Sequence, residues 1–178
     1  MSPPLSSPVH PSAMPRWKPG PSLASDAVWV RGDRILLVRR GRPPFKGHWA
    51  LPGGFVDPEE RVEEAVLREL REETGLSGRV ESIVEVYSGP DRDPRKPVTS
   101  VVFLVGGRAG RPQGGDDASE ARWVPLREAK GLAFDHDAIV ADALDLLRGR
   151  PRAAGGRFTT WRPRRSGRRP PGRRTRAG

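Results

Sequence analysis

Residues 51–76 read LPGGFVDPEERVEEAVLRELREETGL, and this stretch decides the fold. Its glycine pair supplies a flexible loop with accessible backbone carbonyl groups. Asp57 as a cap, Pro58 in the first turn and Gly75 at the end predict one helix from Pro58 to Thr74. The stretch therefore predicts a glycine loop that leads into a long helix.

The predicted helix carries more negative charge than a solvated surface helix needs. Residues 59–73 contain seven Glu and three Arg. At about 100° per residue, Glu69, Glu72 and Glu73 fall within or beside the apolar stripe that must face the core. Like charges at such short range repel one another and raise carboxyl pKa values. A cation is therefore expected among these three carboxylates.

The chemistry of the cluster favours Mg²⁺ or Mn²⁺ as that cation. Arg68 lies one turn from Glu72 and offsets only part of the charge. Oxygen ligands without His or Cys are typical of these two ions, which keep waters for phosphate oxygens. The competing interpretation is an ordinary Glu/Arg-rich helix that is solvated and stabilised by pairs four residues apart.

The acidic residues stand in a longer pattern, G-x5-E-x7-R-E-U-x-E-E-x-G-U, in which U is apolar. The matching residues are Gly54, Glu60, Arg68, Glu69, Leu70, Glu72, Glu73, Gly75 and Leu76. At ordinary residue frequencies a chance match has a probability on the order of 10⁻⁹ per starting position. The pattern resembles the Nudix box of Nudix hydrolases. The resemblance implies an α+β fold, an α/β/α sandwich around a mixed β-sheet, over residues 25–147.

The resemblance also implies a reaction and roles for the box residues. The reaction is Mg²⁺-dependent hydrolysis of a nucleoside diphosphate linked to another moiety, by attack of water on phosphorus. The implied metal ligands are the carbonyl of Gly54 and the carboxylates of Glu69, Glu72 and Glu73. Arg68 is expected to orient these carboxylates, and Glu60 to form a hydrogen bond behind them. The general base comes either from the box or from a later loop, where the candidates are Asp116, Asp117 and Glu120.

Two further stretches resemble the ADP-ribose pyrophosphatase branch of the family. They are residues 87–95, YSGPDRDPR, and residues 132–139, LAFDHDAI. The substrate-binding candidates are Asp91, Arg92 and Asp93 for the ribose and phosphate groups, and Phe45, Trp49 or Tyr87 for stacking on adenine. His136 is expected to cap the last helix rather than to act in catalysis.

The expected reaction is therefore the hydrolysis of ADP-ribose to AMP and ribose 5-phosphate. One alternative keeps the class and changes the substrate to an oxidised nucleoside triphosphate or NADH. Another changes the class to a ligand sensor or a nucleic-acid-associated binding module. Because every acidic residue of the box is present, an enzyme is favoured over a sensor.

Outside the box, short β-branched runs alternate with turn residues. Strands are expected at residues 27–30, 35–38, 49–51, 80–87, 99–105 and 121–124, and a closing helix at residues 135–147. The first two strands flank a turn at residues 31–34 and predict a hairpin. Apolar patterns with the period of strands (two residues) and of helices (about 3.6 residues) both occur within about 125 residues. Together they predict an α/β or α+β domain.

Both ends of the chain are expected to be disordered. Residues 1–24 contain seven Pro and little periodic apolar pattern, so they cannot bury enough surface to offset the entropy of ordering. Residues 148–178 carry 12 Arg and no acidic residue, which leaves 20 basic against 22 acidic residues in the rest of the chain. The net charge of +10 therefore belongs to this last segment. Nucleic acid is an open but not favoured partner of the segment, through phosphate charge and stacking on Phe158 and Trp161.

Composition excludes several other classes. No run of 18 apolar residues is present, which rules out a membrane protein. The chain has no cysteine, which excludes a disulfide scaffold and a thiolate nucleophile. The first residues lack the pattern of a secretory signal, so a cytoplasmic location is expected. A homodimer is left open.

Overall fold

Eight strands form two four-stranded sheets, one mixed and one antiparallel, in the computed structural model, which describes residues 19–108, 110–115 and 118–149. The first sheet has the order β5-β1-β7-β6. Its strands are β1 (Ser22–Val28), β5 (Gly53–Phe55), β6 (Arg79–Tyr87) and β7 (Val98–Gly106). Strands β1 and β7 are parallel, while the β1–β5 and β6–β7 pairs are antiparallel.

Strand β3 organises the second sheet. This strand (Arg34–Arg40) pairs antiparallel with β2 (Val30–Arg31), β4 (Trp49–Ala50) and β8 (Ala118–Pro125). The expected hairpin is confirmed for β2 and β3, in which Val30 lies opposite Ile35. The preceding residues 27–28 belong instead to β1 of the first sheet, because their partners are residues 103–104 of β7.

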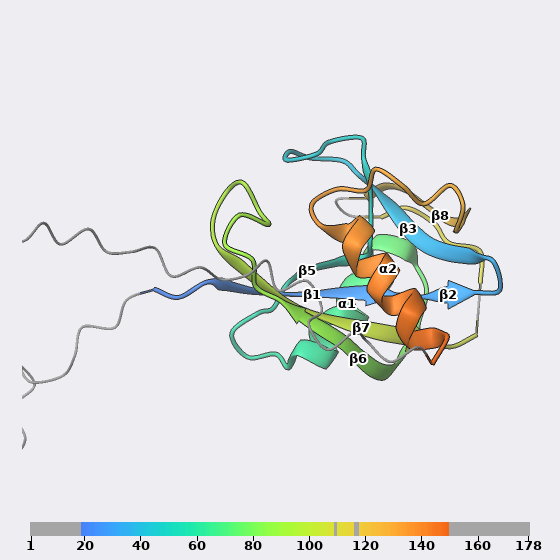
Figure 1. The fold of residues 1–178 in the computed structure, drawn as a ribbon, viewed down its shortest axis with the longest axis horizontal. Coiled ribbons are helices and arrows are strands. Elements are labelled where there is room, and N and C mark those ends of the chain that lie inside the picture. The colour runs from blue at the N-terminus through green and yellow to red at the C-terminus, as the bar shows by residue number, and fades with distance from the viewer. Residues whose placement is uncertain (1–18, 109, 116–117, 150–178) are drawn as a thin grey trace, which may run out of the picture.

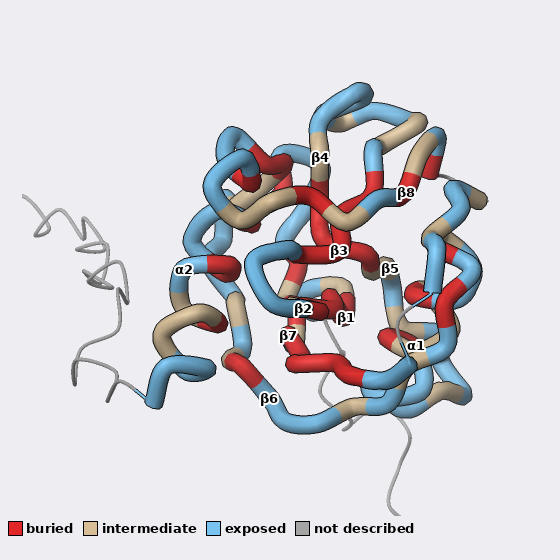
Figure 2. The backbone as a smooth tube through the Cα atoms, turned by 90° about the vertical axis from the view of Figure 1, so that its right-hand side faces the viewer, coloured by how far each residue is buried: buried red, intermediate tan, exposed pale blue. Residues whose placement is uncertain are grey.

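The two helices, α1 (Val62–Thr74) and α2 (His136–Leu147), lie on opposite sides of the strands (Figure 2). Successive side chains of a strand point to opposite faces, so both faces are buried here. Ala27 and Phe103 pack in one cluster with Leu70 of α1. Val28 packs in a second cluster with Ile139 of α2. The α/β/α sandwich expected from the sequence is confirmed.

The start of α1 differs from the prediction. The helix begins at Val62 rather than Pro58, and residues 58–60 form a turn instead. This turn closes on itself because the Glu60 amide donates to the Asp57 carbonyl (3.1 Å) and the Asp57 amide donates to Glu60 Oε2 (3.2 Å). The end at Thr74 is confirmed, and Gly75 takes the left-handed conformation (φ 69°) that favours glycine.

Three other boundaries differ. Gly53 and Gly54 form strand β5 rather than a loop, since they pair with Asp26 and Ser25 of β1. Strand β1 begins at Ser22, inside the segment expected to be disordered up to residue 24. Strand β8 begins at residue 118, so the expected loop before residue 121 is shorter than predicted.

Residues 1–18 and 150–178 of the predicted terminal segments, which include Phe158 and Trp161, lie outside the described residues. Within the part of the chain that the structure describes, neither helix is long and apolar enough to cross a membrane.

Candidate active site

A pocket of about 250 Å³ opens where β1, β5 and α1 meet three loops. The chain segments that form it are distant in sequence. Its lining includes Asp26 of β1, Arg40 at the end of β3, Gly53 and Gly54 of β5, Glu69 and Glu73 of α1, Arg92 and Asp93 of the loop at residues 88–97, and Phe134 and His136 near the start of α2. The pocket therefore gathers two of the four box glutamates, Glu69 and Glu73, and part of the predicted substrate loop.

The two glycines of β5 are closely packed on different sides, Gly53 against β1 and Gly54 against α1. A Cβ at Gly54 would overlap the Glu69 carboxylate, and a Cβ at Gly53 would overlap the Ser25 carbonyl. The Gly53 amide also donates to Glu73 Oε2 at 3.0 Å. The glycine pair thus allows the backbone of β5 to lie directly against two carboxylates of the helix.

Arg68 forms hydrogen bonds to three carboxylates, those of Glu60, Glu69 and Glu72. Its Nε and Nη2 donate to both oxygens of Glu60 (2.8 and 3.0 Å), and its Nη1 donates to Glu69 Oε1 (2.8 Å) and Glu72 Oε2 (3.0 Å). A further bond from Nη2 reaches the Phe55 carbonyl at 3.2 Å. These bonds raise the pKa of Arg68 and lower that of Glu60. Arg68 is placed to fix the orientation of the acidic side chains, and Glu60 contacts Arg68 behind them.

Glu73 is the carboxylate whose charge is least compensated. Burial raises its pKa to about 8, and the neighbouring carboxylates of Glu69 and Asp26 add to the rise. The hydrogen bond from Gly53 and the charge of Arg40 oppose it only in part. A carboxyl group in this state binds either a proton or a cation near neutral pH.

The donors fit a hard divalent cation. In the described residues no three carboxylate or imidazole side chains converge into a ready-made metal cluster, and Arg68 bridges the carboxylates of Glu69 and Glu72. The chemistry nevertheless suits Mg²⁺ or Mn²⁺: side-chain donors that are all carboxylate oxygens, an excess of negative charge, and a β5 backbone kept close to Glu69 by Gly54.

The predicted substrate loop is only partly brought to the pocket. Arg92 lines it, but its guanidinium forms two hydrogen bonds to Asp135 (3.0 and 2.8 Å) and its side chain is 6% exposed. Asp93 also lines the pocket and is bonded to Arg95, which lowers the pKa of Asp93. Asp91 is exposed and lies outside the lining. Arg92 and Asp93 are thus each paired with a protein residue of opposite charge.

The aromatic candidates lie outside the lining. Trp49 and Tyr87 pack against the core on the α2 side, and the Tyr87 hydroxyl donates to Asp142 at 2.8 Å. Phe45 is 37% exposed and reaches the pocket only through Phe134, whose ring lies 4.9 Å from its own. Phe134 was not among the predicted site residues.

Of the later candidates for the general base, the structure describes Glu120, which does not line the pocket. Glu120 lies on strand β8, where it pairs with Arg122 and lies 3.9 Å from Arg39. It is therefore in a strand rather than the predicted loop. Asp116 and Asp117 fall outside the described residues.

His136 has a different role from the one predicted. The residue that caps α2 is Asp135, and His136 is the first residue of the helix. Its imidazole is buried, and Nδ1 accepts a hydrogen bond from the Leu51 amide at 2.9 Å. Burial lowers the pKa of His136, so the neutral ring joins α2 to the chain just before β5. No local signal in the sequence indicated this contact.

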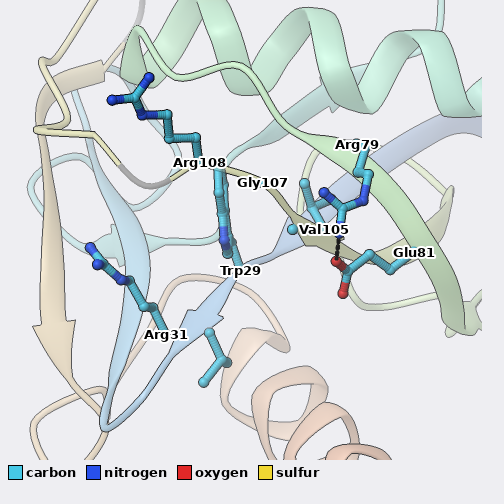
Figure 3. Close-up of a pocket in the computed structure, with 9 residues that line it drawn as sticks. Trp29, Arg31, Arg79, Glu81, Val105, Gly107 and Arg108 are labelled. Carbon is cyan, nitrogen blue, oxygen red and sulfur yellow. Dashed lines mark hydrogen bonds and ion pairs between the residues drawn. The ribbon is translucent and has the colours of Figure 1, made fainter.

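A second, larger hollow of about 590 Å³ lies at the ends of β2, β6 and β7 (Figure 3). Its charged lining is Arg31, Arg79, Arg108 and Glu81, and Arg79 pairs with Glu81 at 3.1 Å. None of the box carboxylates lines it. This hollow therefore lacks the groups needed to hold a divalent cation.

One mixed and one antiparallel sheet between two helices, with a glycine strand packed against an acidic helix, are the arrangement expected of a Nudix domain. The family model described as NUDIX domain matches residues 21–146, and the chain belongs to this family. The resemblance drawn from residues 54–76 is confirmed.

Named relatives and solved structures agree with this assignment. An ADP-ribose pyrophosphatase of Methanocaldococcus jannaschii is 50% identical over 122 residues, which cover 68% of this chain and 72% of the relative. The ADPR responsive transcriptional repressor NtrR of Acinetobacter baylyi is 32% identical, with 75% of this chain and 57% of the repressor covered. This chain therefore spans little more than half of the repressor.

Two of the matching structures contain nucleotides. One is the NUDIX domain of Shewanella oneidensis NrtR complexed with ADP ribose (30% identity, TM-score 0.67, 78% of this chain and 94% of that chain). The other is a bifunctional NMN adenylyltransferase/ADP ribose pyrophosphatase of Francisella tularensis complexed with AMP and a Mn ion (30% identity, TM-score 0.63, 74% of this chain and 43% of that chain).

Proposed function

We propose that this Nudix hydrolase cleaves the diphosphate bond of ADP-ribose to give AMP and ribose 5-phosphate, with Mg²⁺ or Mn²⁺ as cofactor. The observation that carries the proposal is the pocket in which Glu69 and Glu73 face the glycine strand β5 with too little positive charge to balance them. The 50% identity to a protein named ADP-ribose pyrophosphatase supports the choice of substrate.

The cation would be held by the carboxylates of Glu69, Glu72 and Glu73 and the carbonyl of Gly54. When bound, such an ion neutralises phosphate oxygens and lowers the pKa of a coordinated water. Arg68 keeps Glu69 and Glu72 oriented, and the Gly53 amide keeps Glu73 directed at the pocket. We assign the general base to the box carboxylates rather than to Glu120, because Glu120 pairs with Arg122 and lies outside the lining.

The loop at residues 88–97 would act as a wall of the substrate pocket. Its residues Arg92 and Asp93 are held by Asp135 and Arg95, so they present a fixed surface. A fixed wall favours one shape of ligand because little ordering is needed on binding. Asp91, exposed at the start of the same turn, remains the candidate for contact with the outer ribose.

A substrate panel tests the proposal. With saturating Mg²⁺, ADP-ribose should give a kcat/KM at least about tenfold above those for NADH and 8-oxo-dGTP, a difference of only about 1.4 kcal/mol in transition-state binding. Chromatography should identify AMP and ribose 5-phosphate as products. The Glu73→Gln variant serves as the inactive control. If 8-oxo-dGTP gave the highest kcat/KM of the panel, ADP-ribose would be refuted as the preferred substrate. The proposal that the chain is a hydrolase would still hold.

A second candidate is an ADP-ribose-responsive binding module without turnover. It is favoured by the similarity to the repressor of Acinetobacter baylyi. The complete acidic box of this chain argues for the enzyme. Binding of ADP-ribose with no product after prolonged incubation with Mg²⁺ would establish the module instead. The cytoplasmic location, a homodimer and nucleic-acid binding by residues 148–178 stay predictions of the sequence.

A further inference from the structure

Arg40 combines a place in the pocket with an incomplete set of hydrogen bonds. It is the last residue of β3, and its side chain lines the same pocket as Glu73. Its Nε donates to the Pro44 carbonyl at 2.8 Å. Within the described ranges of the chain, its two terminal nitrogens have no hydrogen-bond or ion-pair partner. The side chain is thus anchored at one nitrogen in a residue that lines the pocket.

Two other arginines of the pocket lining, Arg92 and Arg95, differ from Arg40. Arg92 forms two hydrogen bonds to Asp135, and Arg95 forms two to Asp93. Burial and the charge of Arg95 lower the pKa of Arg40, although a guanidinium stays protonated in proteins. Positive charge is therefore held at Arg40 without a matching carboxylate in direct contact.

A strained aromatic pair fixes the plane of this guanidinium. The Phe134 ring lies 4.8 Å from the guanidinium carbon of Arg40, in a cation–π contact. Among the described residues, the non-glycine positions with positive φ are Phe134 (56°) and Phe45 (60°), and their rings touch each other. Left-handed backbone is unfavourable for a large side chain and persists where the surrounding structure demands it. The backbone of Phe134 places the ring that contacts Arg40, and the Phe45 ring packs against the Phe134 ring.

We propose that Arg40 binds the diphosphate of the substrate through its two terminal nitrogens, and that Phe134 is a positioning residue that holds the guanidinium plane. The inference rests on the proposed function, because it names a group that reads the substrate of that site. A planar guanidinium matches phosphate oxygens in a bidentate arrangement that an ammonium group does not reproduce. The phosphate role that the sequence suggested for Arg92 thereby passes to Arg40.

The test separates anion binding from turnover. Calorimetry in EDTA measures the binding of inorganic pyrophosphate and of ADP-ribose to the full chain. Arg40→Gln should weaken both by about 10- to 100-fold, the range that follows from losing hydrogen bonds to a charged group. Arg40→Lys should recover only part of the loss. Arg34→Gln, on the same strand but exposed and bonded to the Trp123 carbonyl, should bind both probes like the unmodified chain.

Phe134→Leu keeps the apolar volume and removes the aromatic face. It should weaken pyrophosphate binding by about 3- to 10-fold and raise KM more than it lowers kcat, while its Tm stays close to that of Arg34→Gln. Equal pyrophosphate binding by Arg40→Gln and the unmodified chain, or no pyrophosphate binding by the unmodified chain, overturns the proposal. Failure of the unmodified chain to hydrolyse any nucleoside diphosphate derivative refutes the proposed function, and the calorimetry still decides the role of Arg40.

Discussion

Helix α1 and the loop at residues 88–97 form two walls of one pocket, and they differ in how their charges are balanced. In α1, one arginine bonds three carboxylates, and Glu73 is left with a pKa raised to about 8. In the loop, Arg92 and Asp93 each have a partner of opposite charge. Unbalanced charge requires a ligand, while balanced charge stabilises the chain itself. We therefore expect catalysis at the helix and a supporting role for most of the loop.

The largest loss of activity should come from substitutions in helix α1, whose negative charge is not balanced. Glu73→Gln and Glu72→Gln should each lower kcat by at least about a thousandfold, which corresponds to about 4 kcal/mol of transition-state stabilisation. Their metal-free Tm should equal or exceed that of the unmodified chain, because one charge of a repelling cluster is gone. Steady-state assays at saturating Mg²⁺ and thermal melts measure both. Glu63→Gln, exposed on the same helix, is the matched control. Near-normal activity of Glu73→Gln and Glu72→Gln would contradict the assignment of the active site to α1.

A glycine substitution sharpens the comparison with less disturbance of charge. Gly54→Ala puts a methyl group where the Glu69 carboxylate lies, so kcat should fall by about a hundredfold as the carboxylate is displaced. Gly89→Ala in the loop meets nothing closer than the Arg92 Cβ at 4.0 Å and should change kcat less than about twofold. Equal activity of the two variants would contradict the close approach of β5 to the helix.

A substitution in the loop at residues 88–97 should lower the stability of the protein rather than the rate of the chemical step. Arg92→Gln leaves Asp135 without its partner, and the loss of one member of a largely buried pair costs about 2–4 kcal/mol. Tm should fall by about 5–15 °C, while KM rises to a similar degree for ADP-ribose and for other nucleotides. A selective rise for ADP-ribose, with Tm unchanged, would restore the substrate role that the sequence predicts for Arg92.

The smallest effect is a pH dependence of the metal-free protein. The folded pKa of Glu73, about 8, lies above the unfolded value near 4.3, so the folded state binds more protons between these values. Stability should therefore decrease as pH rises from about 5 to 8, with Tm lower by about 3–10 °C. Melts in EDTA should show this decrease, and it should be absent in Glu73→Gln. A Tm that is constant across this range in the unmodified chain would contradict the raised pKa.

The sequence was most informative where the contacts are local. The end of α1, the spacing of Glu69, Glu72 and Glu73, and the contact of Arg68 with Glu72 four residues later all follow from helical geometry. It was least informative where the partner is distant in the chain. The pairing of Gly53 with Asp26 across β1 and β5 turned a predicted loop into a strand, and Asp135 binds Arg92 from 43 residues away.

The same limit explains the residues that sequence reasoning missed. Arg40 ends a strand with a continuous buried run at residues 35–38, and this run gives no signal for its role. The contact with Phe134, whose backbone is left-handed, is seen only in the fold. A positive φ at a phenylalanine has no local sequence signal, because it is imposed by packing. Likewise, burial of His136 against the Leu51 amide depends on how α2 packs against strands that are distant in the sequence.

Binding of Mn²⁺ to the full chain tests the central claim most directly, since it needs neither substrate nor turnover. Titration followed by electron paramagnetic resonance should show a site in the unmodified chain and in Glu63→Gln. Glu73→Gln should weaken this site by at least about tenfold. Equal Mn²⁺ affinity in all three proteins would contradict the assignment of the unbalanced carboxylates of α1 to a metal-dependent active site.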